Sequence, residues 1–120
     1  MSHIQRISCI YKITCDAEGR SYVGKTQNVG GRWWSHLGML SANAHPNTEL
    51  QRVYNQYGAD SLSFSILDSV PVDDLSRAEA YWIEKYGLDN LYNVARVRCP
   101  GYTDVDRFVS FINNKWLYAG

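Results

Sequence analysis

The stretch CIYKITCDAEGRSYVG, residues 9–24, holds two short apolar runs on either side of a turn-forming segment. Apolar and β-branched residues over 8–15 and 20–24 predict two strands. The intervening DAEG ends in a glycine that can adopt positive φ, so we expect the two strands to form an antiparallel hairpin. Each strand carries a tyrosine, Tyr11 or Tyr22, and core packing is the simplest interpretation of either one taken alone.

Helical and strand periodicities continue along the chain after this hairpin. Apolar residues spaced by three and four predict helices, and one strand alternates serines with apolar residues. The predicted segments are a helix that Thr26 or Asn28 caps, a helix over 47–58, a strand over 61–68 with Leu62, Phe64 and Ile66 inward, a helix over 73–87, a short extended piece over 91–97 and a helix over 103–120. This order, β-β-α-α-β-α plus a C-terminal helix, predicts an α+β fold in which helices flank a small, largely antiparallel three-stranded sheet.

Length, charge and cysteine usage narrow the class of protein. The 120 residues suit one domain, and no run is apolar and long enough to cross a bilayer. Cys9, Cys15 and Cys99 form an odd count without metal-ligand spacing, which indicates reduced thiols in an intracellular compartment. Twelve Lys and Arg balance twelve Asp and Glu, so bulk charge does not by itself favour a nucleic-acid partner.

A carboxylate stands on the apolar stripe of the third predicted helix. Glu79 follows Leu75 by four residues and precedes Trp82 by three, so it points with them toward the core. An acid in that place needs a cation, a metal or several donors. Arg32 and His36, four residues apart, are candidate partners, and the alternative is a surface pair beside a buried tryptophan. On pattern alone, Glu79 fits a structural ion pair as well as a functional group.

Taken as a set, these residues resemble the motifs of the GIY-YIG nuclease family. The resemblance rests on CIY at 9–11, YVG at 22–24, GRWWSH at 31–36, AEAYWIEKYG at 78–87 and LYNVA at 91–95, in the family's order and spacing. HPNTELQRVYNQYG, at 45–58, is similar to the catalytic modules of phage homing endonucleases in particular. The resemblance implies a nuclease catalytic domain over 1–95, followed by a C-terminal extension over 96–120.

The resemblance also implies a set of site residues. The catalytic residues that it implies are Tyr11, Tyr22, Arg32, His36 and Glu79, with Glu79 as the metal ligand. Its substrate-binding or supporting residues are Gly24, His45 and Asn93. One departure is Cys9, which stands where the first motif of the family has a glycine, and we expect its small side chain to be tolerated.

The implied chemistry is phosphodiester hydrolysis, which needs a nucleophilic water, charge compensation at the phosphate and help for the leaving oxygen. In the mechanism that the resemblance implies, Glu79 would hold one Mg²⁺ ion, for which Mn²⁺ is a possible substitute, and Arg32 would donate two hydrogen bonds to the phosphate. Tyr11 is the general base, and we expect Mg²⁺ or Arg32 to lower its pKa from about 10. Tyr22 and His36 orient the water and the phosphate, and Asn93 supports the site.

We therefore predict a metal-dependent endonuclease that hydrolyses phosphodiester bonds in DNA. The alternatives are a restriction- or repair-type nuclease of the same family and a non-catalytic nucleic-acid-binding module. Because a neutral chain makes few phosphate contacts, the predicted partners are DNA and a separate DNA-binding domain or partner protein. The extension over 96–120 carries an amphipathic helix that packs on the domain or makes a dimer contact, so we expect a monomer or weak homodimer. We expect it in the cytoplasm, which for a phage-encoded chain is that of the host cell.

Overall fold

The computed structural model describes residues 8–93 of the chain. Its elements are the strands β1 (Cys9–Cys15), β2 (Arg20–Thr26) and β3 (Leu62–Ser69), the helices α1 (Val29–Ser41), α2 (Thr48–Tyr57) and α3 (Leu75–Tyr86), and 3₁₀ turns at Ala59–Ser61, Val72–Asp74 and Leu88–Asn90. The predicted order β-β-α-α-β-α is confirmed. The predicted helix over 103–120 and the boundary between 1–95 and 96–120 lie outside the described residues.

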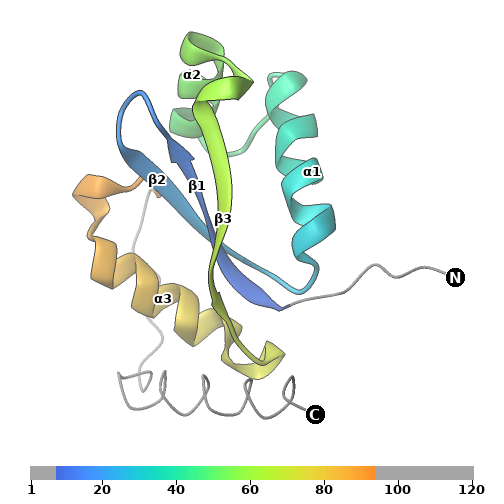
Figure 1. The fold of residues 1–120 in the computed structure, drawn as a ribbon, viewed down its shortest axis with the longest axis vertical. Coiled ribbons are helices and arrows are strands. Elements are labelled where there is room, and N and C mark those ends of the chain that lie inside the picture. The colour runs from blue at the N-terminus through green and yellow to red at the C-terminus, as the bar shows by residue number, and fades with distance from the viewer. Residues whose placement is uncertain (1–7, 94–120) are drawn as a thin grey trace, which may run out of the picture.

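The strands form an antiparallel sheet in the order β2-β1-β3, with β1 in the centre (Figure 1). In the β1–β2 pair, Tyr11 lies opposite Gly24 and Ile13 lies opposite Tyr22. Residues that are opposite each other, or two apart on one strand, share a face of the sheet. The four residues therefore lie on one face, and this hairpin register brings both tyrosines to the same side.

The edge strand β3 departs from the predicted alternation. Leu62 is buried and Phe64 packs against the core, but Ile66 is 49% exposed and Asp68 is buried instead. A register shift between β1 and β3, at residues 10 and 11 of β1, inserts an extra residue into β3 after Ile66 and turns Asp68 to the other face of the sheet, opposite Ile10. Ile66 precedes this bulge and lies opposite Tyr11, on the face of Phe64, but it is left exposed there, so the prediction that Ile66 packs inward is wrong.

Each face of the sheet carries its own apolar core. One cluster joins the Tyr11 face to α1 and α2 and contains Cys9, Tyr11, Ile13, Cys15, Leu40, Leu50, Val53, Leu62 and Tyr92. The other joins the opposite face to α3 and contains Ile10, Val23, Val70, Leu75, Ala78, Ile83 and Leu91. Cys9 and Cys15 are free thiols within the first cluster. None of the helices in residues 8–93 combines the length and apolar character that crossing a bilayer needs.

Asparagine caps begin α1 and α2, and glycines end α2 and α3. Asn28, one of the two expected caps, begins α1, and its side chain accepts a backbone N–H of the first turn. Asn47 caps α2 in the same way. Gly58 and Gly87 end α2 and α3 with φ angles of 85° and 79°, which an L-side chain rarely adopts.

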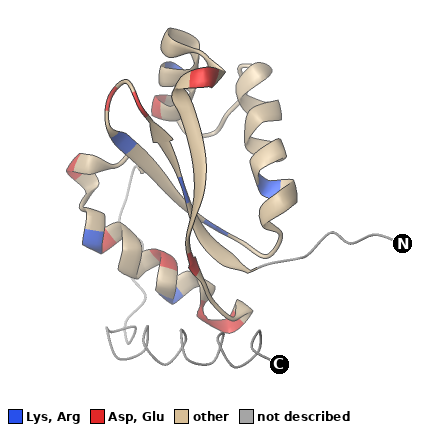
Figure 2. Cartoon of the chain, in the orientation of Figure 1, with Lys and Arg blue, Asp and Glu red and all other residues tan. Residues whose placement is uncertain are grey.

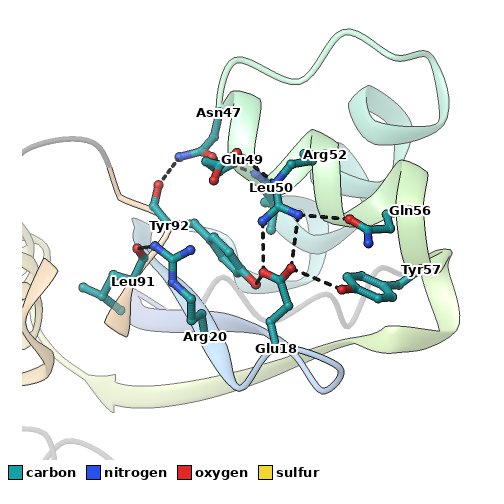
Figure 3. Close-up of polar contacts among 10 residues, drawn as sticks. All are labelled: Glu18, Arg20, Asn47, Glu49, Leu50, Arg52, Gln56, Tyr57, Leu91 and Tyr92. Carbon is teal, nitrogen blue, oxygen red and sulfur yellow. Dashed lines mark hydrogen bonds and ion pairs between the residues drawn. The ribbon is translucent and has the colours of Figure 1, made fainter. Parts of the chain in front are cut away.

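Glu18, in the hairpin turn, joins three segments of the chain (Figure 3). Arg52 of α2 donates to both carboxylate oxygens at 3.1 and 3.0 Å, and the Tyr92 and Tyr57 hydroxyls donate at 2.7 and 3.3 Å. Arg52 above all, then Tyr92, lowers the pKa of Glu18 to about 2. This network ties the hairpin to α2 and to the segment after α3.

Candidate active site

The buried hydroxyl of Tyr11 is where two of the predicted site residues, Arg32 and His36, meet. His36 Nε2 lies 2.6 Å from Tyr11 Oη, and Arg32 Nε donates to the same oxygen at 3.1 Å. The Tyr11 ring is fully buried and stacks on Phe64, with 4.9 Å between ring centroids. The spacing of four between Arg32 and His36 therefore directs both side chains of α1 to one atom of β1.

Gly24 leaves the space that the Tyr11 ring occupies. A Cβ atom at Gly24 would lie 2.4 Å from Tyr11 Oη and 2.5 Å from Cζ, closer than real Cβ contacts. The two residues are direct cross-strand partners, so a side chain at 24 would occupy the same place as the end of the ring. The glycine is thus required by close approach at the centre of the site.

His36 and His45 extend the contact away from Tyr11. His36 Nδ1 lies 2.8 Å from His45 Nε2, and the two rings stack with 5.0 Å between centroids. Tyr22 meets both rings edge-on, at 5.6 Å from His36 and 6.4 Å from His45. Burial, then the Arg32 and His45 charges, lower the pKa of His36 to about 4, and burial also lowers the pKa of His45. Since His36 is only 1% exposed, the alternative of a surface pair with Arg32 is wrong.

The two tyrosines are harder to ionise than free tyrosine. Burial raises the pKa of Tyr11 to about 12, although the hydrogen bond from Arg32 acts in the opposite direction. Burial also raises the pKa of Tyr22, again against the charge of Arg32. Arg32 alone therefore does not give Tyr11 the lowered pKa that we predicted, because loss of hydration outweighs one cationic neighbour.

The cation beside Glu79 is Lys25, and not Arg32 as the sequence indicated. Lys25 Nζ lies 3.5 Å from Glu79 Oε1 and also donates to Ser76 Oγ at 3.2 Å. The Glu79 side chain is 13% exposed. Burial raises the pKa of this carboxyl, while Lys25 and then Arg32 lower it. Strand alternation was the signal for Lys25, because it shares the sheet face of Val23, on which α3 packs.

Glu79 fits the kind of site that Mg²⁺ uses in phosphoryl chemistry. Mg²⁺ binds through one or two carboxylates and completes its shell with waters and substrate phosphates. Within residues 8–93, no group of three or more His, Cys, Asp or Glu side chains could hold a metal together. A metal here would therefore be shared between Glu79, solvent and substrate.

Asn93 binds the outer edge of β2. Its side-chain amide donates to the Val23 carbonyl at 2.9 Å and accepts the Val23 N–H at 3.0 Å. The N–H of Tyr92 donates to the Ser21 carbonyl at 2.7 Å, and Leu91 forms a bridge with Ser21. The predicted extended piece is thus confirmed over 91–93, where it supports the strand that carries Tyr22 and Gly24.

Two further polar residues near the site, Asn47 and Gln51, had not been selected from the sequence. Both are buried, and both hold His45 through hydrogen bonds. The signal for Gln51 was its place between Leu50 and Val53, on the side of α2 that packs inward. Asn47 was concealed by its other role as a helix cap.

Comparison with known proteins identifies the family. The family model of the GIY-YIG catalytic domain matches residues 7–93. The chain belongs to the GIY-YIG family. A solved structure of the catalytic domain of homing endonuclease I-TevI is 31% identical, with a TM-score of 0.68, and the alignment covers 73% of this chain and 98% of that one. A glutamate-to-alanine variant of the catalytic domain of intron endonuclease I-TevI is 29% identical, with a TM-score of 0.71 and coverages of 77% and 97%. No curated protein sequence matches the chain.

The resemblance that the motifs indicated is therefore confirmed, both for the GIY-YIG family and for its phage homing endonuclease catalytic domains. Nearly the whole length of each I-TevI domain is represented in this chain. The α+β fold of this GIY-YIG nuclease domain is confirmed as well.

Proposed function

We propose that this GIY-YIG protein is a metal-dependent DNA endonuclease of the homing-endonuclease type. The observation that carries the proposal is the convergence of Arg32 and His36 on the Tyr11 hydroxyl, within the electrostatic reach of the Glu79 carboxylate. The similarity to catalytic domains of an intron and homing endonuclease supports DNA as the substrate.

Arg32 links the proton acceptor to the phosphate. Its Nε donates to Tyr11, and within the described residues its two terminal nitrogens make no hydrogen bond. A guanidinium keeps its charge at any relevant pH and binds phosphate oxygens in pairs. Arg32 therefore places a phosphate next to Tyr11 and stabilises the charge that builds up on the phosphoryl oxygens.

Tyr11 accepts the proton of the attacking water. As the water attacks phosphorus, its proton passes to the Tyr11 oxygen, and the bond from phosphorus to the leaving oxygen breaks. Because the pKa of Tyr11 is about 12 in the protein alone, its phenolate forms only with added positive charge. Tyr22 and His36 orient the water and the phosphate through their positions around the Tyr11 ring, and His45, Gly24 and Asn93 support the site.

Glu79 is the residue that would hold Mg²⁺ or, as a substitute, Mn²⁺. When bound, the ion supplies positive charge that polarises the phosphate and favours the leaving oxygen. Lys25 is the counter-ion of Glu79, and its charge acts against the rise in pKa that burial causes in this carboxyl. This chain thus contributes one carboxylate, and the remaining ligands come from water and DNA.

Strong binding to DNA depends on a separate domain or partner protein. Figure 2 shows positive and negative residues interspersed over the sheet and helices. In residues 8–93 most basic side chains are already engaged, among them Arg52 with Glu18, Arg77 with Asp74 and Lys25 with Glu79. We propose residues 1–95 as the catalytic domain and 96–120 as the extension that packs on it or joins two copies.

Cleavage of supercoiled plasmid tests the proposed function. The wild-type protein with Mg²⁺ is expected to nick or linearise the plasmid, and EDTA is expected to abolish this. Glu79→Ala should lose cleavage by at least about 100-fold, while Glu84→Gln on the same helix serves as the control for a lost carboxylate. Cleavage that persists at the wild-type rate in Glu79→Ala protein contradicts the assignment of the metal ligand. Sequencing of the cut ends separates a homing enzyme from a restriction- or repair-type enzyme.

A further inference from the structure

A continuous line of hydrogen bonds runs from a backbone amide to the Tyr11 hydroxyl. The Asn47 N–H donates to His45 Nδ1 at 3.0 Å. His45 Nε2 then lies 2.8 Å from His36 Nδ1, and His36 Nε2 lies 2.6 Å from Tyr11 Oη. Histidine nitrogens can donate or accept, but a backbone N–H can only donate. The N–H of Asn47 at one end of the line therefore determines whether each later nitrogen donates or accepts a hydrogen bond.

The direction of each bond follows from this fixed donor. His45 Nδ1 accepts from Asn47, so it carries no proton, and the proton of the neutral ring is on Nε2. His45 Nε2–H then donates to His36 Nδ1, which places the proton of His36 on its own Nε2. His36 Nε2–H finally donates to Tyr11 Oη. Burial, which lowers the pKa of both histidines, favours these neutral rings.

The Tyr11 oxygen is consequently a double acceptor. It receives one N–H from His36 and one from Arg32 Nε. Neither of these two nitrogens can accept the proton of the hydroxyl, because both are donors, so the O–H points away from them. Two N–H donors also favour the phenolate over the phenol, since hydrogen bonds to a charged form stabilise that form. This arrangement suits a residue that must accept a proton from outside the line.

Hydrogen bonds with Asn47 and Gln51, at the start of α2, hold His45 in the required orientation. The Asn47 side chain caps α2 by accepting the Leu50 N–H at 2.9 Å and donates to the Tyr92 carbonyl at 2.9 Å, which positions its backbone amide. Gln51 Oε1 accepts the His45 N–H at 3.1 Å, and its amide nitrogen donates to the Leu40 carbonyl at 2.9 Å. Gln51 thus fastens the loop between α1 and α2 at both ends.

We propose that Asn47 and Gln51 are positioning residues that fix His45 and His36 as Nε2–H tautomers, so that His36 acts as a hydrogen-bond donor to Tyr11 and not as its base. The tautomers follow from the geometry alone, and their consequence for catalysis rests on the proposed nuclease function. In this scheme neither histidine takes up a proton during the reaction. Tyr11 releases its proton on the side away from His36 and Arg32, and then accepts a proton from the attacking water.

Imidazole ¹⁵N NMR of the full chain tests the tautomers without any nuclease assay. The chain has three histidines, and single His3→Gln and His45→Gln variants assign the signals. At pH 7 we expect both His36 and His45 to show an unprotonated Nδ1 and a protonated Nε2. A protonated Nδ1 on either ring, or an imidazolium at this pH, overturns the proposal whether or not the protein cuts DNA.

A pair of substitutions at His45 tests the direction of the line. His45→Gln can retain an N–H donor toward His36 Nδ1, whereas His45→Glu offers an acceptor and should move the proton of His36 onto Nδ1. We expect cleavage to fall by no more than about tenfold in the Gln variant and by at least about 100-fold in the Glu variant, with the ¹⁵N spectrum of His36 reporting the change of tautomer. Equal losses with an unchanged His36 tautomer in folded protein overturn the positioning role, and if the Glu variant does not fold, the wild-type spectrum still decides.

Discussion

A methyl group at Gly24 is the smallest perturbation that should disable the centre of this site. In Gly24→Ala, the new Cβ would stand 2.4 Å from Tyr11 Oη and 2.5 Å from Cζ. Real Cβ contacts essentially never fall below 3.0 Å, so the end of the ring must move by about 0.6 Å at least. The ring is fully buried between Phe64 and His36, so it has no free space to move into.

The expected magnitude follows from what this displacement breaks. Overpacking a filled core costs about 1–3 kcal/mol. Stretching the 2.6 and 3.1 Å hydrogen bonds of Tyr11 adds about 1 kcal/mol for each bond that is lost. We therefore expect a loss of about 2–4 kcal/mol in the free energy of unfolding, and a fall in Tm of roughly 10 °C. Misplacing the proton acceptor by this distance should also slow cleavage by about 100-fold.

Thermal and denaturant unfolding, followed by plasmid cleavage below the transition, measure both effects. Gly38→Ala in α1 is the matched control, because a Cβ there meets no atom within 4 Å. That control should be stabilised by about 0.5–1 kcal/mol, since alanine favours a helix more than glycine does. The same change of residue is thus expected to have opposite effects on stability at the two positions.

A double-mutant cycle with Tyr11→Leu identifies the cause. Leucine lacks the end of the ring that the new methyl group would meet, so Gly24→Ala should cost less than about 1 kcal/mol in that background. A Gly24→Ala protein with wild-type Tm and activity refutes the steric reasoning. The same loss in the Tyr11→Leu background would locate the damage in the β2 backbone and not in the ring contact.

Four further outcomes are expected. The pKa of Glu18 is about 2 in the folded protein and near 4.5 otherwise, so its stabilising effect is present above pH 4.5 and is lost as the pH falls toward 2. When the denaturant midpoint is measured against pH, it should fall less on acidification in Glu18→Gln than in wild type. Identical curves for the two proteins contradict this. Lys25→Met removes the cation beside Glu79 and should strengthen Mn²⁺ binding by up to about fivefold. Line broadening in NMR spectra measures this binding, and weaker binding by the variant would be the contrary result. Asn47→Ala should lower the free energy of unfolding by about 1–2 kcal/mol and Asn47→Ser should restore much of it, whereas equal losses in the two variants would exclude the cap as the cause. The affinity of the chain for DNA should change little with salt, with a slope of log K against log salt of about −2 or shallower, and a slope near −6 would contradict the proposed need for a separate DNA-binding domain.

The chain's own pattern of residues was enough to predict the order of elements, the hairpin, the helix ends and the family. These features depend on neighbours along the sequence: alternation in β1, glycines after α2 and α3, and an asparagine before α1. The candidate site residues were also found from the sequence, because the motifs that contain them can be recognised by their order and spacing alone.

Contacts between segments far apart along the chain were decided only by the tertiary structure. Lys25, and not Arg32, became the partner of Glu79 because α3 packs on the sheet face that Lys25 shares. Asp68 was turned to the α3 face of the sheet by a register shift that no alternation in β3 could indicate, since a register belongs to two strands at once. The pKa of Tyr11 likewise depends on burial, and the direction of the histidine line depends on the backbone amide of Asn47, far from Tyr11 along the sequence. Both exist only when the chain has folded around them.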